Sequence, residues 1–233
     1  MDSLLCPPIG FAHRGARALA PDNTLESFAL ARRLGAAGLE TDVWLTSDGV
    51  AVLDHDGVVR VGLRRRPIAE VARRALPASI PSLADLYAAC GTDFDLSIDI
   101  KDPAAAPAVI ALARDAGAEH RLWLCHHQVE VLATWRPLSP DIRLVDSTRV
   151  RRIREGLERR AARHAELGID AVNLHHSDWT TGLATLWHRF ERYTLAWDAQ
   201  QPRVLAGLLA MGMDGVYSDH VDRMVAAIEL HTR

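Results

Sequence analysis

Short apolar runs alternate with amphipathic stretches along almost the whole chain. The runs have the length of strands, and the stretches between them, such as Leu25–Leu34, Ala104–Ala116 and Arg203–Met211, place apolar residues at helical spacing. Strands that alternate with helices are typical of an α/β fold with a parallel sheet. The expected strands are Ile9–Ala12, Leu39–Leu45, Phe94–Ile100, Arg121–Cys125, Ile142–Asp146, Ala171–Leu174, Tyr193–Trp197 and Gly215–Ser218.

Eight expected strands in a chain of 233 residues predict a (β/α)₈ TIM barrel, a fold that typically needs about 250 residues. An open doubly wound sheet is the alternative, but no glycine-rich phosphate loop follows the first expected strand. No linker, repeat or low-complexity stretch divides the chain. We therefore expect residues 1–233 to form a single barrel domain. Asn23, with Glu26 three residues later, predicts a capping box at the start of the first helix.

One connection departs from the alternation. Only Thr46–Gly49 separates Leu39–Leu45 from a second apolar run, Val50–Leu53, and four residues cannot form the crossover between parallel strands. Asp-Gly between two strand-like runs is typical of a two-residue type I′ turn. We therefore predict an antiparallel β-hairpin near residues 40–56.

This hairpin would gather chemically active side chains. With Asp48 and Gly49 as the two turn residues, Asp42 lies directly opposite His55. Glu40 falls on the same face as Asp42 because side chains alternate along a strand. Two carboxylates and an imidazole are therefore predicted to lie together.

Charge and composition narrow the classes of function. The chain carries 27 basic and 30 acidic residues, and this balance gives no sign of a nucleic-acid partner or a polybasic membrane anchor. No stretch approaches the ~20 apolar residues of a membrane span, and the N-terminus lacks a signal-peptide pattern. Three scattered cysteines without metal-site spacing are expected to be reduced. We expect a soluble, cytoplasmic protein without stable membrane insertion, and its oligomeric state is left open.

The carboxyl ends of the expected strands carry a coherent set of chemical groups. Active sites of barrels lie at these ends, so the side chains there are expected to meet. Three carboxylates among them offer hard oxygen ligands, which suit one divalent cation, Mg²⁺ or Ca²⁺, with Mn²⁺ as a third candidate. The set consists of His13, Arg14, Glu40, Asp42, Asp99 and Lys101, together with His55 from the hairpin.

These groups suit the chemistry of a phosphodiester. Three carboxylates against a divalent cation, an arginine and a lysine leave one net positive charge, which favours a phosphodiester monoanion. Two histidines, with an ordinary pKa of about 6.5, can serve as base and acid near neutral pH. A His-Arg-Gly or Glu-x-Asp motif alone is common in loops and solvated strands. It is the order of the motifs along one chain that indicates an active site.

That order resembles the glycerophosphodiester phosphodiesterase family. The motifs are AHRG…APDNT, LETDV, LDHD and IDIK, with LAWDA and GMDGVYSD matching the closing strands, so the similarity covers roughly residues 9–228. The resemblance implies a phospholipase-C-like barrel that hydrolyses a small-molecule glycerophosphodiester to glycerol 3-phosphate and an alcohol. By the same resemblance the catalytic pair is His13 and His55, the metal ligands are Glu40, Asp42 and Asp99, and the substrate contacts are Arg14, Lys101 and Trp197.

Two departures from the family pattern bear on the site. Asp99 stands where the family usually has glutamate, and its side chain is shorter by one methylene, about 1.3 Å. The segment near residues 57–67 is shorter than the family's usual insertion, which helps to cover the site. The basic run Arg64–Arg66, together with Arg73 and Arg74, is expected to form a solvated helix and its approach. Asp219, at the end of the last strand, is expected to orient His13 through a hydrogen bond.

Other interpretations stay open on the sequence alone. A lysophospholipase D- or C-like phosphodiesterase would form a cyclic phosphate, and a barrel of the same fold could bind glycerophosphates without turnover. A metal-dependent amidohydrolase is disfavoured because the first strand lacks His-x-His. Four further histidines at strand ends are weaker candidates for the site, namely His126, His127, His175 and His176.

Overall fold

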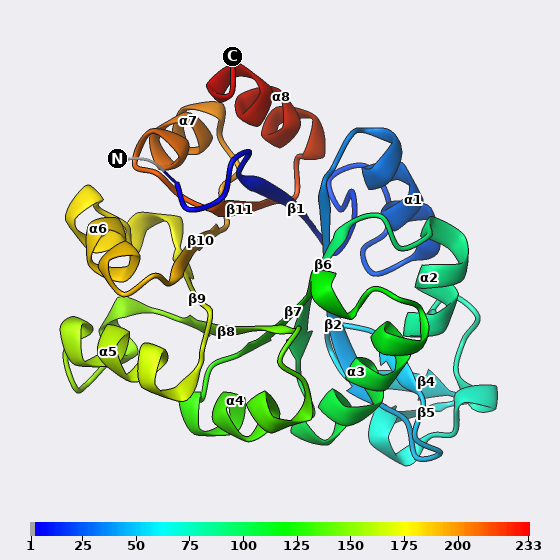
Figure 1. The fold of residues 1–233 in the computed structure, drawn as a ribbon. Helices are drawn as coiled ribbons and strands as arrows, with labels where there is room; N and C mark the ends of the chain where they lie inside the picture. The colour runs from blue at the N-terminus through cyan, green and yellow to red at the C-terminus, as the bar shows by residue number, and fades with distance from the viewer. Residues whose placement is uncertain (1–2) are drawn as a thin grey trace.

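The structure, a computed structural model, describes residues 3–233. Within this range eight parallel strands close into a barrel, and helices surround it (Figure 1). The predicted (β/α)₈ barrel is confirmed. In order around the barrel the strands are β1 (Ile9–His13), β2 (Gly38–Leu45), β6 (Asp95–Ile100), β7 (Leu122–His126), β8 (Arg143–Thr148), β9 (Ala171–His175), β10 (Tyr193–Trp197) and β11 (Gly215–Ser218), which pairs with β1.

The helices lie on the outside of the barrel. They are α1 (Leu25–Arg33), α2 (Leu83–Cys90), α3 (Ala106–Asp115), α4 (Val129–Trp135), α5 (Leu157–Leu167), α6 (Thr181–Arg189), α7 (Pro202–Ala210) and α8 (Val221–His231). The N-cap of α1 is Thr24, whose side chain accepts the N–H of Ser27 at 3.2 Å, so the predicted capping role of Asn23 is wrong. Across residues 3–233, no helix has the length and apolar character needed to cross a membrane.

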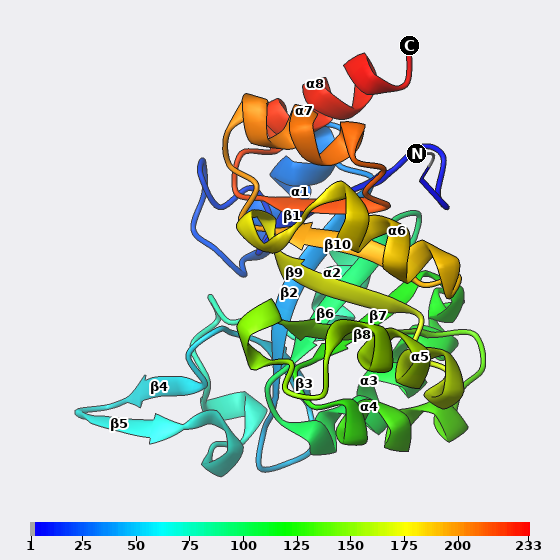
Figure 2. The same cartoon turned by 90° about the vertical axis from the view of Figure 1, so that its left-hand side faces the viewer.

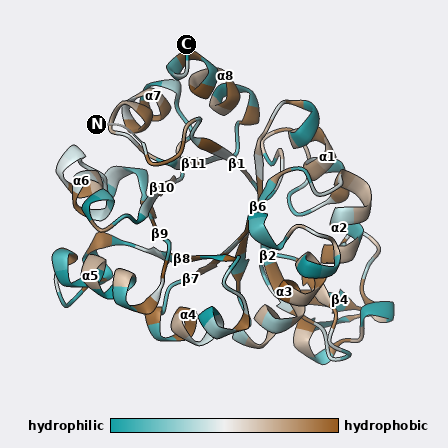
Figure 3. Cartoon of the chain, viewed as in Figure 1, coloured by the Kyte–Doolittle hydropathy of each residue, from teal (hydrophilic) through white to brown (hydrophobic). Residues whose placement is uncertain are grey.

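Two apolar layers hold the barrel together. Inside it, Phe11 stacks on Tyr217 with ring centroids 4.7 Å apart and meets Trp123 edge-on at 5.8 Å. A larger layer lies between strands and helices, and Figure 3 shows helices that carry both hydrophobic and hydrophilic residues, as elements with one buried face must. His13 lies two residues after Phe11 on the same face of β1. The alternation of side chains along β1 therefore places Phe11 in the barrel interior and the imidazole of His13 at the carboxyl end of the barrel.

The predicted hairpin forms between β2 and β3 (Ala51–Leu53), but in a different register. Its loop has three residues rather than two and ends at Gly49, whose φ of 80° is the left-handed conformation typical of such loops. Asp42 therefore lies opposite Asp54, whose N–H donates to the carbonyl oxygen of Asp42 at 3.1 Å. The predicted pairing of Asp42 with His55 is wrong by one residue.

The segment near residues 57–67 forms a second hairpin, made of β4 (Val58–Val61) and β5 (Arg64–Pro67). It extends away from the barrel (Figure 2), and Leu63 at its tip is 91% exposed. Arg64–Arg66 lie in β5 and are solvated as expected, so the approach to the expected helix is a strand. Arg73 and Arg74 begin a short 3₁₀ helix, Arg73–Ala75. Gly62, which adopts a φ of 62° between the two strands, makes the turn of this hairpin, and the antiparallel pairing of β4 with β5 holds the arginines in an extended strand.

Candidate active site

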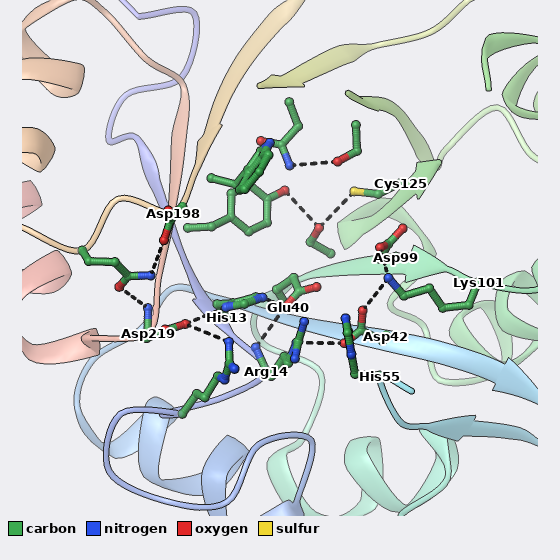
Figure 4. A pocket seen from close by; sticks show the side chains of 17 residues that line it. His13, Arg14, Glu40, Asp42, His55, Asp99, Lys101, Cys125, Asp198 and Asp219 are labelled. Atoms are coloured by element: carbon green, nitrogen blue, oxygen red, sulfur yellow. Dashed lines mark hydrogen bonds and ion pairs between the residues drawn. The ribbon is translucent and has the colours of Figure 1, made fainter. Parts of the chain in front are cut away.

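A pocket of about 350 Å³ opens at the carboxyl end of the barrel (Figure 4). The structure brings to its wall the eight residues to which the sequence assigned a catalytic, metal-binding or substrate-binding role, whereas the weaker candidates His126, His127, His175 and His176 do not line it. The eight residues are His13, Arg14, Glu40, Asp42, His55, Asp99, Lys101 and Trp197. The roles of these residues stay predictions, but their convergence is a property of the fold.

His13 is the last residue of β1, and its ring lies between two carboxylates. Its Nδ1 is 2.6 Å from Oδ1 of Asp219, the hydrogen bond expected from the sequence, and its Nε2 is 3.8 Å from Oε2 of Glu40. Burial alone would lower the pKa of His13, but Glu40 and the hydrogen bond to Asp219 outweigh it and raise the pKa above 6.5. Because Asp219 holds Nδ1, Nε2 is the nitrogen left for chemistry in the pocket.

Glu40 is a buried carboxylate with little positive charge around it. Its Oε2 accepts the backbone N–H of Arg14 at 2.9 Å. Arg14 adopts a φ of 53°, which is uncommon for a residue with a Cβ and is often found at functional sites. Burial raises the pKa of Glu40 to about 7, against the opposing effect of His13. A carboxyl group in this position favours a cation beside it.

Asp42 is also buried, but cationic and amide groups surround it. Its Oδ2 lies 3.1 Å from Nε of Arg14 and accepts Nδ2–H of Asn23 at 3.2 Å, while its Oδ1 lies 3.0 Å from Nζ of Lys101. Asn23 in turn accepts the hydroxyl of Thr41 at 2.7 Å. The Asn23 side chain is thus committed to the strand beneath the pocket, which is why it does not cap α1.

Asp99 completes the acidic set. It pairs in register with Asp42 on the neighbouring strand, and its carboxylate contacts Nζ of Lys101, so one ammonium group lies against both aspartates. Three carboxylates from adjacent strands form a hard-oxygen donor set, and the buried Glu40 lacks a full countercharge. The donor chemistry of the three carboxylates therefore fits a hard divalent cation of the predicted kind. Within residues 3–233 their oxygens do not all lie within 4.8 Å of one another, and Nζ of Lys101 contacts both aspartates.

His55 reaches the pocket from the turn after β3. The carboxylate of Asp54 accepts the N–H of Gly57 at 2.7 Å and closes this turn. Gly57 lies on the ring of Trp44, where an added Cβ would come within 2.4 Å of a ring carbon. The tight turn leaves the His55 side chain 43% exposed, with Nδ1 2.9 Å from Asp56. The imidazole therefore stands at the open edge of the pocket, on the same side as the three carboxylates (Figure 4).

Several residues of the pocket wall were not predicted. Ser97 lies below the acidic set, with Oγ 3.0 Å from the hydroxyl of Tyr217, and Asn173 and Gln200 line the side formed by β9 and β10. Ser97 and Asn173 occupy inward positions two residues before polar strand ends, so strand alternation could have found them. Gln200 follows β10 in a loop, and no pattern in the sequence marks it.

Comparison with known proteins places this geometry in a family. The sequence model of the glycerophosphoryl diester phosphodiesterase family matches residues 13–223. A probable glycerophosphodiester phosphodiesterase 2 of Mycobacterium tuberculosis is 28% identical, with 92% of this chain and 88% of that protein covered. A glycerophosphodiester phosphodiesterase domain-containing protein 4 of Mus musculus is 53% identical over 49 residues, which are 21% of this chain and 8% of that protein. The chain thus matches only a small part of this longer relative.

A solved structure has the same fold. An Oleispira antarctica phosphodiesterase, in complex with the product sn-glycerol-3-phosphate, is 22% identical, with a TM-score of 0.80 over 95% of this chain and 97% of that one. The likeness extends over the whole barrel, including the strands that line the pocket.

Proposed function

This chain belongs to the glycerophosphoryl diester phosphodiesterase family, and from that premise we propose that it hydrolyses glycerophosphodiesters to glycerol 3-phosphate and an alcohol. The observation that carries the proposal is the convergence of two imidazoles, three carboxylates and two cationic side chains on one pocket. The product held by the Oleispira antarctica relative supports glycerol 3-phosphate as the product here. The cysteines of the described residues are unpaired, which supports a reducing compartment such as the cytoplasm.

Glu40, Asp42 and Asp99 would hold a single divalent cation, Mg²⁺, Ca²⁺ or Mn²⁺. When bound, such an ion withdraws electron density from the phosphate and stabilises the charge that develops in the transition state. Glu40 supplies buried negative charge to this set. Lys101, which contacts both aspartates, and Arg14, which contacts Asp42, balance the two negative charges of Asp42 and Asp99, so that the pocket stays receptive to an anion.

Arg14 and Lys101 bind the phosphate. Both already lie against Asp42, which fixes their charged ends at the mouth of the barrel before substrate arrives. The guanidinium can donate two parallel hydrogen bonds to non-bridging oxygens, and the ammonium contributes a point charge. Trp197 lies in the wall formed by β10 and offers an apolar ring to the carbons of the glycerol group.

His13 and His55 exchange the protons. Nε2 of His13 carries or accepts one proton while Nδ1 remains hydrogen bonded to Asp219, and the exposed ring of His55 serves as the partner. One imidazole takes the proton from the attacking oxygen, and the other protonates the leaving alkoxide. The attacking oxygen belongs to water or to a hydroxyl of the substrate's own glycerol, and the latter gives a cyclic phosphate first.

Product analysis tests the proposal. The protein is incubated with glycerophosphocholine, glycerophosphoethanolamine or a lysophospholipid, with and without a chelator, and products are followed by ³¹P NMR. We expect glycerol 3-phosphate, loss of turnover with chelator, and recovery when Mg²⁺, Ca²⁺ or Mn²⁺ is returned. A Glu40→Gln variant should lose this turnover, while Glu158→Gln, which changes an exposed glutamate of α5, should retain it.

The other outcomes separate the alternatives. A persistent cyclic phosphate would support the lyase-like phospholipase. Saturable binding of the substrates without turnover under any cation would support a binding protein. Turnover that survives the chelator and the Glu40→Gln variant would contradict the role of the acidic set.

A further inference from the structure

A second cluster of potential ligands lies at the rim of the barrel, outside the acidic set. Within residues 3–233, His175, His176 and Asp198 form the group of three whose ligand atoms all lie within 4.8 Å of one another. We propose that these three residues form a separate site for a borderline transition metal such as Zn²⁺. This inference does not depend on the proposed hydrolysis.

The fold places the three side chains together through neighbouring strands. His175 ends β9, His176 begins the turn after it, and Asp198 directly follows β10, which pairs with β9. Nε2 of His175 lies 3.1 Å from Oδ2 of Asp198. Ligand atoms of a tetrahedral zinc site stand about 3.4 Å apart when each bond is about 2.1 Å. His175 and Asp198 already have nearly this spacing, and the ligand atom of His176 lies within 4.8 Å of both.

The surroundings hold His175 in one orientation. Its Nδ1 lies 2.7 Å from the hydroxyl of Ser177, and the edge of its ring meets Trp197 with centroids 4.5 Å apart. Nδ1 also accepts the backbone N–H of Ser177 at 3.1 Å, which places the proton of the neutral ring on Nε2 against Asp198. A metal at Nε2 requires that proton to move to Nδ1, where the Ser177 hydroxyl can accept it in place of the backbone contact. Asp198 adopts a φ of 63°, an uncommon conformation that directs its carboxylate toward β9.

The charges around the cluster favour a cation. Asp198 and Asp178 bring two negative charges near His176, and Arg149 brings one positive charge. Arg149 is held in a two-point ion pair with Asp178, at 2.7 and 3.1 Å, and its guanidinium lies over the ring of Trp197. The arginine is therefore neutralised locally, and the carboxylate of Asp198 remains for the metal.

The donor atoms distinguish this site from the acidic one. Two imidazoles and one carboxylate suit Zn²⁺, Co²⁺ or Ni²⁺, whereas three carboxylates suit Mg²⁺ and Ca²⁺. The molecule also contains a natural comparison. His126 and His127 stack at 4.5 Å and 31°, almost as His175 and His176 do at 4.3 Å and 33°, yet they belong to no such three-ligand group among residues 3–233.

The cluster is connected to His13 by hydrogen bonds. Asp198 accepts Nε2–H of Gln200 at 3.1 Å, and Oε1 of Gln200 accepts the backbone N–H of Asp219 at 2.9 Å. Asp219 binds Nδ1 of His13. Figure 4 shows this chain from Asp198 to His13 along one side of the pocket. A metal bound to Asp198 would therefore be connected through two hydrogen bonds to Asp219, the residue that orients His13.

Titration of the metal-free protein with Co²⁺ tests the site. We expect one equivalent to give the strong visible absorption of a tetrahedral complex, and one equivalent of Zn²⁺ to abolish it by displacement. His176→Gln and Asp198→Asn should each weaken Zn²⁺ binding at least about 10-fold by calorimetry. His127→Gln, which alters the comparison pair, should bind as the wild type does. Circular dichroism of each variant establishes that it is folded.

A Glu40→Gln variant separates this proposal from the hydrolytic one. The tetrahedral Co²⁺ signal should survive in that variant even though turnover is lost. The site is disproved if the wild type gives no tetrahedral spectrum, or if the signal persists in folded His176→Gln and Asp198→Asn proteins. Loss of the signal in His127→Gln would equally disprove it, because the metal would then bind elsewhere.

Discussion

The two sides of the pocket differ in chemistry although both are built from strand ends of one barrel. On the side of β1, β2 and β6 the wall is ionic, and Glu40 and Asp42 are buried on inward strand positions with partners fixed by the backbone register. On the side of β9 and β10 the wall consists of the amides of Asn173 and Gln200, the ring of Trp197 and the single carboxylate of Asp198, which lies beyond the end of β10. Changes on the ionic side should therefore abolish the chemistry, while changes on the other side should adjust it.

Removal of an imidazole on the ionic side is the strongest test of this contrast. His13→Ala should lower kcat about 10²- to 10⁴-fold, because general acid–base catalysis contributes that much. His127→Ala removes an exposed histidine outside the pocket and should stay close to the wild type. Steady-state kinetics with glycerophosphocholine measures both. Normal turnover in His13→Ala would remove the basis of the proposed mechanism.

The residue that orients His13 should have the next largest effect. Asp219→Asn should lower kcat about 10- to 100-fold, since loss of an orienting partner typically costs this much. The hydrogen bond to Asp219 raises the pKa of His13, so the variant should also move the His13 limb of the pH–rate profile to lower pH. A purely structural role would lower activity without moving the profile.

Stability tests the burial of Glu40. Its pKa rises from 4.5 to about 7 on folding, so between these values the unfolded chain releases a proton that the folded protein retains. The metal-free wild type should therefore lose stability as pH rises through this window, by roughly 3 kcal/mol. The Glu40→Gln variant should lose less stability over this pH window, and at pH 8 its melting temperature should be several degrees higher than that of the wild type.

Thermal melts with and without Mg²⁺ provide the control for Glu40. Added Mg²⁺ should stabilise the wild type at pH 8, because a ligand that binds the folded state shifts the equilibrium toward it. It should have little effect on Glu40→Gln. Equal stabilisation of both proteins would place the ion away from this carboxylate.

The smallest effect is expected for the aromatic group on the side of β9 and β10. Trp197→Ala should raise KM about 3- to 10-fold, roughly 1 kcal/mol, because an apolar contact to glycerol is made equally in ground and transition states. The kcat should change by less than about 2-fold. A large fall in kcat with unchanged KM would show that this wall takes part in the chemistry, and the contrast between the two sides would no longer hold.

Some features of the molecule could be predicted because they depend on neighbouring residues. The strand positions follow from local runs of apolar residues, and the arrival of His13 and Asp99 at strand ends follows from alternation along β1 and β6. The register of the β2–β3 hairpin could not be predicted in the same way. Two- and three-residue loops both accept Asp-Gly, and a shift of one residue moves every side chain to the other face.

The sequence by itself determined the order of the eight barrel strands, the (β/α)₈ class, and the residues that meet at the barrel mouth, because these depend on periodicity and on a fold whose strand ends always converge. Only the tertiary structure decided which groups pair there. Asn23 binds Asp42 rather than a helix end, and Gln200 joins Asp198 to Asp219. Such partners lie far apart in the chain, and their distances are set by packing that no local pattern contains.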